Sequence, residues 1–432
     1  MCKPKRMENA GMINKKAYIE LLLLLTLAFA GCSSGLPEES SGSDGSQSRE
    51  STAVMGPSRE VTREPETEPD PLEEQIRKMT LEEKIGQMVI VGLDGYEVDE
   101  NAASMIREHQ VGGFILFRTN VKSSGQLLAL INALKKENSD NKVPLFLSVD
   151  EEGGRISRMP EDINKLPSNK ESGEVNDRDF SYQIGGLLAQ EIKAFGFNMD
   201  FAPVLDIFSN PKNTVIGDRA FGSDADIVSK LGIETMKGIR EGGVIPVVKH
   251  FPGHGDTTVD SHVGLPSIDY DMDRLTGFEL VPFKAAIDNQ ADAVMVAHIL
   301  LSKIDAENPA TMSEAIITGL LRNRLGFNGV VITDDMTMGA IVENYDIGDA
   351  AVRSVNAGSD IVLVCHGNEN RLAVIDALID AADNGTITEQ RLNESVYRIL
   401  KMKSKYGLKD DTVNPVDIEE INRKINAVLK DF

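Results

Sequence analysis

The segment Gly329–Ala340 reads GVVITDDMTMGA, a short apolar run that leads into two adjacent carboxylates, Asp334 and Asp335. A continuous apolar run, without alternation of apolar and polar residues, is typical of a strand buried on both faces, as in a parallel sheet. Seven further runs of this kind occur, at residues 84–93, 111–117, 144–150, 197–207, 244–250, 292–299 and 360–366. This repetition of buried strands indicates a parallel sheet that is covered on both faces.

Helical patterns separate these strands. Apolar residues recur every three or four positions in segments 124–137, 181–196, 226–242 and 273–290, which is the spacing of one face of an α-helix. Parallel strands alternating with helices predict an α/β fold, a single catalytic domain built as a (β/α)8 TIM-type barrel over residues 72–408. A doubly wound open sheet would show the same alternation, so the pattern alone leaves both folds open.

Polar residues at the strand ends favour the barrel. Most of the apolar runs end in a side chain that can bind or catalyse: Asp150, Asp206, Lys249 and His250, His298, Asp334 and Asp335, and His366. The carboxyl ends of all strands in a (β/α)8 barrel meet at one mouth, where the active sites of such barrels lie. We therefore expect these side chains to surround one pocket.

The composition limits the classes of partner. The chain carries a formal net charge of −23 at pH 7, and 41% of its residues are hydrophobic. Nucleic-acid binding needs a positive surface, so we expect no nucleic-acid partner. The charge suits a soluble enzyme with a neutral substrate. The sequence has neither a dinucleotide-binding glycine motif after a strand nor a P-loop, and we expect no cofactor.

Residues 1–32 have the pattern of an export signal. Lys15 and Lys16 precede the apolar run 21–30, and small residues follow it, as in a secretory signal peptide. The stretch FAGC resembles the lipobox of bacterial lipoproteins, with Cys32 as the lipidated residue. We expect an exported protein that is lipid-anchored to the bacterial cell membrane; a plain secretory signal is the alternative. Residues 33–71 are rich in Ser, Glu and Pro and have few apolar residues, so we expect a disordered linker there. We expect residues 409–432 to form a C-terminal tail or helix.

The segment 249–266, KHFPGHGDTTVDSHVGLP, holds three of the six histidines. A zinc site would need His250 and His254 on a helix, and Pro252 with its neighbouring glycines forbids one there, so we expect no metal. His254 is interpreted as a residue that structures the loop. For His298, at another strand end, a contact with substrate and a buried core position are both open.

Several motifs together resemble those of glycoside hydrolase family 3. LLRNRLGFNGVVITDD, which ends at Asp335, is similar to the nucleophile motif of that family. KHFPGHGDTTVDSHVGLP is similar to the motif of its single-domain β-N-acetylglucosaminidases, and VDEEGGRISR (149–158), FAPVLDIFSNPKNTVIGDRAFG (201–222) and NPATMS (308–313) match it too. The resemblance covers the chain from about Pro71 to Leu408. It implies a barrel enzyme that cleaves carbohydrate.

The resemblance also implies a role for each matching residue. Asp334 corresponds to the nucleophile, His262 to the general acid/base, and Asp260 to the partner of that histidine. The other matches imply that the pocket for the non-reducing sugar is lined by Asp150, Arg158, Arg219, Lys249 and His250. A histidine suits acid/base work because imidazole titrates near neutral pH, and a nearby carboxylate can fix its tautomer. One carboxylate of the adjacent pair at the strand end is expected to serve as a cap.

The implied function is that of a retaining exo-β-N-acetylglucosaminidase, which removes terminal GlcNAc from peptidoglycan fragments or related glycans. Many family 3 β-glucosidases take their acid/base from a second α/β domain, and too few residues follow Leu408 to form that domain. Three alternatives stay open: phosphorolysis that releases GlcNAc-1-phosphate, a β-glucosidase-type activity, and a sugar-binding lipoprotein without catalysis.

Overall fold

The structure, a computed structural model, describes residues 70–257 and 259–431. Within this part of the chain, eight parallel strands close into a barrel in the order β1-β2-β3-β4-β5-β7-β9-β10, and β10 pairs back with β1. This closure confirms the predicted (β/α)8 barrel and excludes the open sheet. The predicted signal, the lipidation site Cys32 and nearly all of the predicted linker lie outside the described residues.

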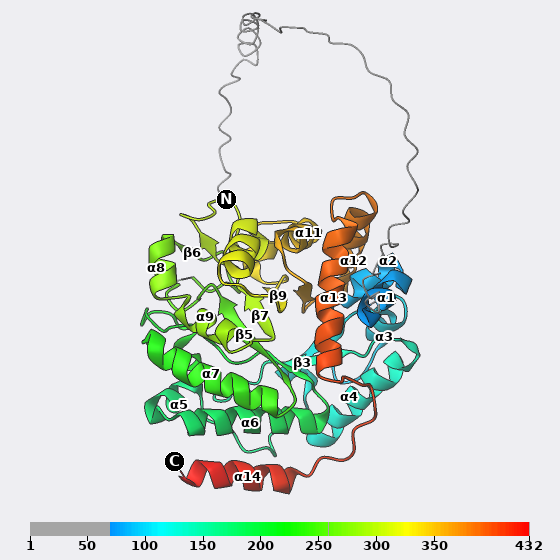
Figure 1. Ribbon diagram of the computed structural model, residues 1–432. Helices are drawn as coiled ribbons and strands as arrows, with labels where there is room; N and C mark the ends of the chain where they lie inside the picture. The colour runs from blue at the N-terminus through cyan, green and yellow to red at the C-terminus, as the bar shows by residue number, and fades with distance from the viewer. Residues whose placement is uncertain (1–69, 258, 432) are drawn as a thin grey trace, which may run out of the picture. The chain divides into compact units, whose positions relative to one another are not determined.

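Each apolar run contributes one barrel strand, and helices surround the strands (Figure 1). The barrel strands are β1 Val89–Gly92, β2 Gly113–Leu116, β3 Phe146–Val149, β4 Met199–Asp200, β5 Ile245–Phe251, β7 Ala293–Val296, β9 Val330–Asp335 and β10 Ile361–Val364. A separate two-stranded sheet pairs β6 Ser267–Ile268 with β8 Leu300–Leu301. The α-helices are α1 Pro71–Lys78, α2 Leu81–Gln87, α3 Glu100–Arg107, α4 Ser124–Glu137, α5 Asn169–Val175, α6 Arg178–Phe195, α7 Ala225–Glu241, α8 Met272–Gly277, α9 Val281–Asp288, α10 Gly339–Val342, α11 Ile347–Ala357, α12 Asn368–Asp383, α13 Glu389–Lys405 and α14 Ile418–Asp431.

A capping box explains where the first barrel strand begins. The Thr80 hydroxyl accepts the backbone N–H of Glu83, and the Glu83 carboxylate accepts the backbone N–H of Thr80. This reciprocal pair starts α2 at Leu81. The first part of the expected strand 84–93 is therefore helical, and β1 begins only at Val89.

Two other expected elements differ from the prediction because of proline. Residues 273–290 form two helices, α8 and α9, since Pro282 in the first turn of α9 has no N–H with which to continue a preceding helix. Within the run 197–207, only Met199–Asp200 belongs to a barrel strand, and Pro203 lacks the N–H that a longer ladder would need. These breaks leave irregular backbone at the carboxyl end of the barrel.

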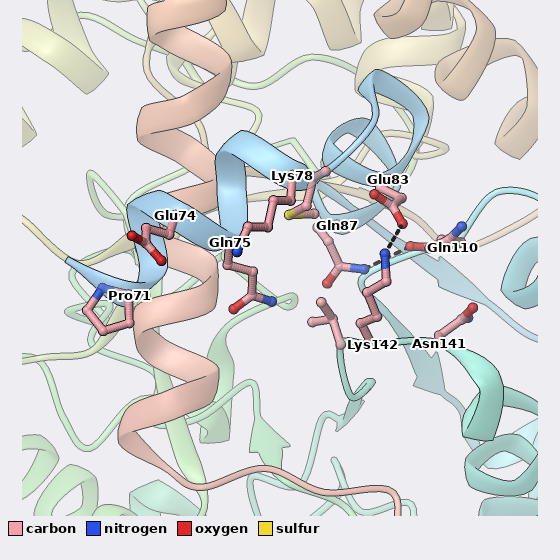
Figure 2. Close-up of a pocket in the computed structure, with 11 residues that line it drawn as sticks. Pro71, Glu74, Gln75, Lys78, Glu83, Gln87, Gln110, Asn141 and Lys142 are labelled. Carbon is pink, nitrogen blue, oxygen red and sulfur yellow. Dashed lines mark hydrogen bonds and ion pairs between the residues drawn. The ribbon is translucent and has the colours of Figure 1, made fainter. Parts of the chain in front are cut away.

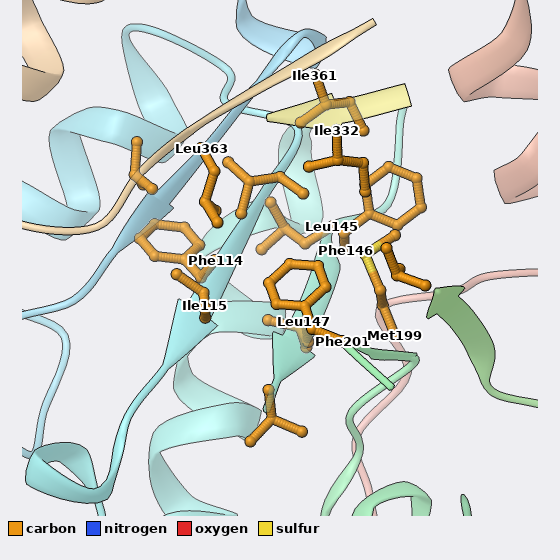
Figure 3. Packing of buried hydrophobic residues seen from close by; sticks show 14 of the residues in the cluster. Phe114, Ile115, Leu145, Phe146, Leu147, Met199, Phe201, Ile332, Ile361 and Leu363 are labelled. Carbon is orange, nitrogen blue, oxygen red and sulfur yellow. The ribbon is translucent and has the colours of Figure 1, made fainter. Parts of the chain in front are cut away.

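Apolar side chains fill the inside of the barrel. Figure 3 shows Phe114, Phe146, Phe201, Ile332 and Leu363 packed in one cluster, although they come from separate strands or strand ends. All five are buried. The barrel is thus a packed core rather than a pore, and a ligand can reach only the ends of its strands.

A buried carboxylate ties the last strand to the elements behind it. Asp360, which precedes β10, lies 2.5 Å from Arg322, 3.0 Å from Arg391 and 3.1 Å from Arg398. It also accepts the backbone N–H of Val331 in β9 at 3.0 Å. Burial alone would raise the pKa of Asp360, but the three guanidinium groups outweigh it and lower that pKa. The ionised carboxylate joins β9 and β10 to α13 and to the π-helix Ala315–Arg324.

The predicted C-terminal segment 409–432 contains α14, which packs beside α6 (Figure 1). Ile421 and Ile425 on α14 are buried. The side-chain oxygen of Asn422 accepts the backbone N–H of Asn164 at 2.7 Å, so α14 also holds the loop that follows β3. None of the helices in the described residues is long and apolar enough to cross a membrane.

Candidate active site

A cavity of about 300 Å³ lies at the carboxyl ends of the barrel strands. Seven of the site residues expected from the sequence line it: Asp150, Arg158, Arg219, Lys249, His250, His262 and Asp334. The eighth, Asp260, is hydrogen-bonded to His262. The fold therefore brings all eight together at one mouth, in a cavity large enough for a small ligand.

Two cations and two carboxylates form a buried network on one wall. Lys249 Nζ lies 2.5 Å from Asp150 Oδ1 and 2.7 Å from Glu152 Oε1. Arg219 donates two hydrogen bonds to Glu152, at 2.8 Å from Nε and 2.7 Å from Nη2. Burial opposes these charges, but their mutual attraction outweighs it: the pKa of Glu152 is lowered, and those of Lys249 and Arg219 are raised. The wall presents fixed, ionised groups to a ligand.

His250 is held as a single tautomer. Its Nδ1 lies 2.6 Å from Asp206 Oδ2, and its Nε2 lies 3.3 Å from Arg219 Nη2. A guanidinium group can only donate, so Nε2 accepts and the ring proton lies on Nδ1, which donates to Asp206. The other oxygen of Asp206 accepts the backbone N–H of His254 at 2.6 Å. One buried carboxylate thus fixes His250 near the end of β5 and His254 in the segment that follows it.

The two carboxylates at the end of β9 have different environments. Asp335 accepts hydrogen bonds from the N–H and hydroxyl of Thr337 and from the N–H of Cys365, so it structures the turn and joins it to β10. Asp334 lines the cavity and accepts the N–H of Asp335 at 2.9 Å. Burial alone would raise the pKa of Asp334, but His298, His250 and this N–H outweigh it and hold the pKa below its usual range. Asp334 is ionised and faces the cavity.

His262 and Asp260 form a hydrogen-bonded pair on the loop after β5. Asp260 Oδ1 accepts from His262 Nδ1 at 2.8 Å and from its backbone N–H at 2.9 Å. Partial burial would raise the pKa of Asp260, but these bonds outweigh it and lower that pKa. The His262 side chain is 66% exposed. Because Nδ1 is engaged by Asp260, Nε2 is the ring nitrogen that is open to a ligand.

Two other histidines are bonded inside the protein. His298 is buried, with Nε2 2.9 Å from the carbonyl oxygen of Asp335 and Nδ1 2.8 Å from the Thr311 hydroxyl. Burial lowers its pKa, and both ring nitrogens are occupied, so His298 is a core histidine. His254 is also buried, with Nε2 3.1 Å from the Ser261 hydroxyl, which agrees with the structuring role expected for it.

The sequence interpretation missed Glu152 and a buried acidic group next to it. Glu151 accepts the backbone N–H of Arg158 at 2.7 Å, and its own N–H donates to Asp200 Oδ1 at 3.0 Å. Burial raises the pKa of Glu151 to about 7 and those of Asp200 and Glu191 well above their usual values. The run of three acidic residues at the end of β3 was the available signal. It could not tell which carboxylate pairs with cations and which keeps its proton.

A second cavity of about 300 Å³ lies near the amino ends of β1, β2 and β3 (Figure 2). Figure 2 shows the ion pair across it between Lys142 and Glu83, which are 3.3 Å apart. The other labelled residues are mostly amides, including Gln75, Gln87 and Gln110. None of the predicted site residues lines this cavity, and active sites of such barrels lie at the opposite end.

Comparison with known proteins identifies the family to which this chain belongs. Residues 80–402 match the family described as Glycosyl hydrolase family 3 N terminal domain. The chain belongs to glycosyl hydrolase family 3. The barrel and the family inferred from the motifs of the sequence are both confirmed.

This family 3 chain is similar to a solved structure and to two beta-hexosaminidase sequences. The structure of a family 3 β-N-acetylglucosaminidase from Paenibacillus sp. str. FPU-7 is 39% identical, with a TM-score of 0.77 over 81% of this chain and 68% of that chain. Beta-hexosaminidase A of Pseudoalteromonas piscicida is 35% identical over 327 residues, 70% of this chain and 55% of the relative. A beta-hexosaminidase of Methylobacillus flagellatus is 36% identical over 284 residues, 64% of this chain and 80% of the relative. The predicted enzyme class, a glycoside hydrolase that binds carbohydrate, is confirmed.

Proposed function

We propose that this family 3 enzyme is a retaining exo-β-N-acetylglucosaminidase that removes terminal β-linked GlcNAc from peptidoglycan fragments or related glycans. The main support is one observation: an ionised Asp334 and the Asp260-bound His262 face the same cavity of about 300 Å³. The relatives named as a β-N-acetylglucosaminidase and as beta-hexosaminidases support the choice of sugar. A cavity of this size suits a single terminal sugar, which supports action at chain ends.

In the first step, Asp334 attacks the anomeric carbon of the bound sugar. The new bond joins a carboxylate oxygen of Asp334 to that carbon, and the glycosidic bond to the leaving oxygen breaks. His262 Nε2 gives its proton to the leaving oxygen. Asp260 accepts from His262 Nδ1, so it orients the ring and stabilises the imidazolium from which the proton leaves.

In the second step, water takes the place of the leaving group. His262 Nε2 accepts a proton from the water, whose oxygen bonds to the anomeric carbon while the ester to Asp334 breaks. Two displacements on the same carbon return its original configuration, which makes the reaction retaining. The N–H of Asp335 donates to Asp334 at 2.9 Å and helps this carboxylate to leave as an anion.

The buried charged wall holds the hydroxyl groups of the sugar. Asp150 accepts from hydroxyls, while Lys249 and Arg219 donate to their oxygens. His250 Nε2 is an acceptor in this tautomer and is positioned at the same wall. Arg158 lines the cavity from the loop after β3. Fixed groups of this kind cost little reorganisation when the transition state forms.

Kinetics with a small set of aryl glycosides test this function. The 4-nitrophenyl β-glycosides of GlcNAc, glucose and xylose are compared, with and without phosphate. We expect the highest kcat/KM for the GlcNAc glycoside and free GlcNAc as the product in both buffers. Asp334→Asn is expected to lower kcat by about 10³-fold or more, because a neutral amide is a poor nucleophile. Preference for the glucoside, or GlcNAc-1-phosphate as the product, would contradict the proposal.

We also propose that the enzyme is exported and lipid-anchored through Cys32. The support is the order of features in residues 1–32: a basic region, an apolar run and FAGC. In a bacterial host fed a clickable fatty acid, the full chain is expected to carry the label and to sediment with membranes, and Cys32→Ser is expected to lose both properties. Labelling that persists in Cys32→Ser would contradict the anchor.

A further inference from the structure

The loop that carries His262 is attached to its surroundings through Ser261. We call residues Val259–Gly264 the dyad loop. Ser261 is buried, although the next residue, His262, is exposed. The Ser261 hydroxyl lies 3.1 Å from His254 Nε2, and its carbonyl oxygen accepts the backbone N–H of Ala340 at 3.1 Å. The dyad loop is therefore held on one side by the segment after β5 and on the other by α10.

His254, the first of these partners, lies in the segment that follows β5 and is hydrogen-bonded on several sides. Its backbone N–H donates to Asp206, which also accepts from His250 Nδ1. Its Nδ1 lies 2.8 Å from the Thr257 hydroxyl. Burial lowers the pKa of His254, so the ring is neutral and pairs with two hydroxyl groups that can each donate or accept. An unbroken set of hydrogen bonds thus runs from His250 to Ser261.

The second partner, α10, begins at Gly339, shortly after β9, whose last two residues are Asp334 and Asp335. Gly339 begins this helix, and a Cβ at this position would lie 2.7 Å from the carbonyl oxygen of His262 and 3.2 Å from the carbonyl carbon of Val263. Atoms at such distances overlap, so only glycine lets the dyad loop approach α10 this closely. The backbone of His262 is therefore positioned against α10, the first helix after the strand that carries Asp334.

We propose that Ser261 is a positioning residue, which holds His262 Nε2 at the distance from Asp334 that concerted proton transfer requires. Its side chain fixes the dyad loop to His254 in the segment after β5, and its carbonyl fixes the loop to α10. The inference rests on the acid/base role proposed above for His262 and adds the device that sets its position. A small displacement of this histidine weakens only the steps in which it moves a proton.

Two variants disturb the attachment from different sides. Ser261→Ala removes the bond to His254 and keeps the backbone, and Gly339→Ala drives a methyl group into the dyad loop. Ser267→Ala, an exposed serine in β6, and Gly125→Ala, whose added Cβ would meet nothing within 4 Å, are the matched controls. Each protein is assayed with a GlcNAc disaccharide, whose leaving sugar needs a proton, and with the 2,4-dinitrophenyl glycoside, whose leaving group does not.

The two attachment variants are expected to lose about tenfold or more in kcat/KM on the disaccharide and to stay within about threefold of the unmodified enzyme on the dinitrophenyl glycoside. The controls are expected to match the unmodified enzyme on both. An equal loss on both substrates would show a general structural role and overturn the proposal. Unchanged kinetics on both would overturn it as well.

Hydrogen exchange tests the attachment without any need for activity. In Ser261→Ala, amides in a peptide that covers residues 336–343 are expected to exchange about tenfold faster than in the unmodified enzyme, because the partner of the Ala340 N–H is less firmly held. Ser267→Ala is expected to leave them unchanged. Equal exchange in both variants would overturn the positioning role. Failure of the unmodified enzyme to cleave either glycoside would instead contradict the proposed function.

Discussion

Single residues at the barrel mouth differ in protonation because their neighbours differ. Glu151 is buried and Asp334 is partly buried at the cavity, and burial by itself favours the neutral form of each carboxylic acid. Asp334 lies near two imidazoles and accepts an N–H, and its pKa falls below the usual range. For Glu151, bonds to the Arg158 segment only partly offset burial, and its pKa is raised to about 7. Asp334 is thus ionised at the cavity, as the proposed attack requires, while Glu151 holds its proton to a higher pH.

Glu151→Gln tests this difference through the pH dependence of stability. Folded Glu151 keeps its proton up to about pH 7, while the unfolded chain loses it near pH 4.5. Between these values the folded state binds more protons, so the free energy of unfolding falls as pH rises. We expect the fall between pH 5 and pH 8, measured by urea denaturation, to shrink by about 2–3 kcal/mol in the variant. The exposed control Glu161→Gln is expected to keep the original slope, and an unchanged slope in Glu151→Gln would contradict the assignment.

At individual positions, sequence reasoning succeeded where geometry follows from topology. Lys249, His250 and Asp334 could be placed at one mouth because strand ends in a barrel converge. Glu152 could not be told from Glu151, since both lie on irregular backbone where periodicity gives no facing direction. The buried position of His298 was equally out of reach, because it depends on Thr311 and on a carbonyl group from a different strand.

Strands and helices are held in place by a few polar contacts as well as by the apolar core. The apolar runs predicted all eight barrel strands, since a buried strand needs apolar residues on both faces. Their lengths were less predictable, because Pro203 and the capping box at Thr80 override the apolar pattern locally. The ion pairs of Asp360 could not be predicted from any local sequence pattern, because its three arginine partners are distant in sequence and lie on the π-helix Ala315–Arg324 and on α13.

Asp360→Asn tests how much this tie contributes. The change leaves three arginines without the buried carboxylate that compensates them, and we expect the free energy of unfolding at pH 7 to fall by about 3–5 kcal/mol. Asp349→Asn is the control, because the ion pair of Asp349 with Arg353 spans 3.8 Å and this carboxylate is 64% exposed; its loss is expected to cost less than about 1 kcal/mol. Urea denaturation of both variants measures the difference. Equal, small losses would mean that Asp360 is not a structural tie.

At the scale of the whole barrel, residues from separate sequence motifs meet at one cavity. The barrel brings the charged wall from the ends of β3, β4 and β5, the carboxylate near the end of β9 and His262 of the dyad loop to one cavity. In the proposed function, the wall binds the sugar and His262 donates the proton. Family 3 motifs in the sequence predicted which residues meet at this cavity, and the match over residues 80–402 confirms the family. The central claim is that Asp334 forms a covalent bond to the sugar.

Trapping of the glycosyl-enzyme tests that claim most directly. A 5-fluoro GlcNAc fluoride forms the intermediate but slows its hydrolysis, because fluorine destabilises the oxocarbenium-like transition state. After digestion of the inactivated enzyme, mass spectrometry is expected to find the sugar on Asp334, with no label in Asp334→Asn. A sugar attached to Asp335 or to any other residue, or turnover of the reagent with no covalent adduct at all, would contradict the account.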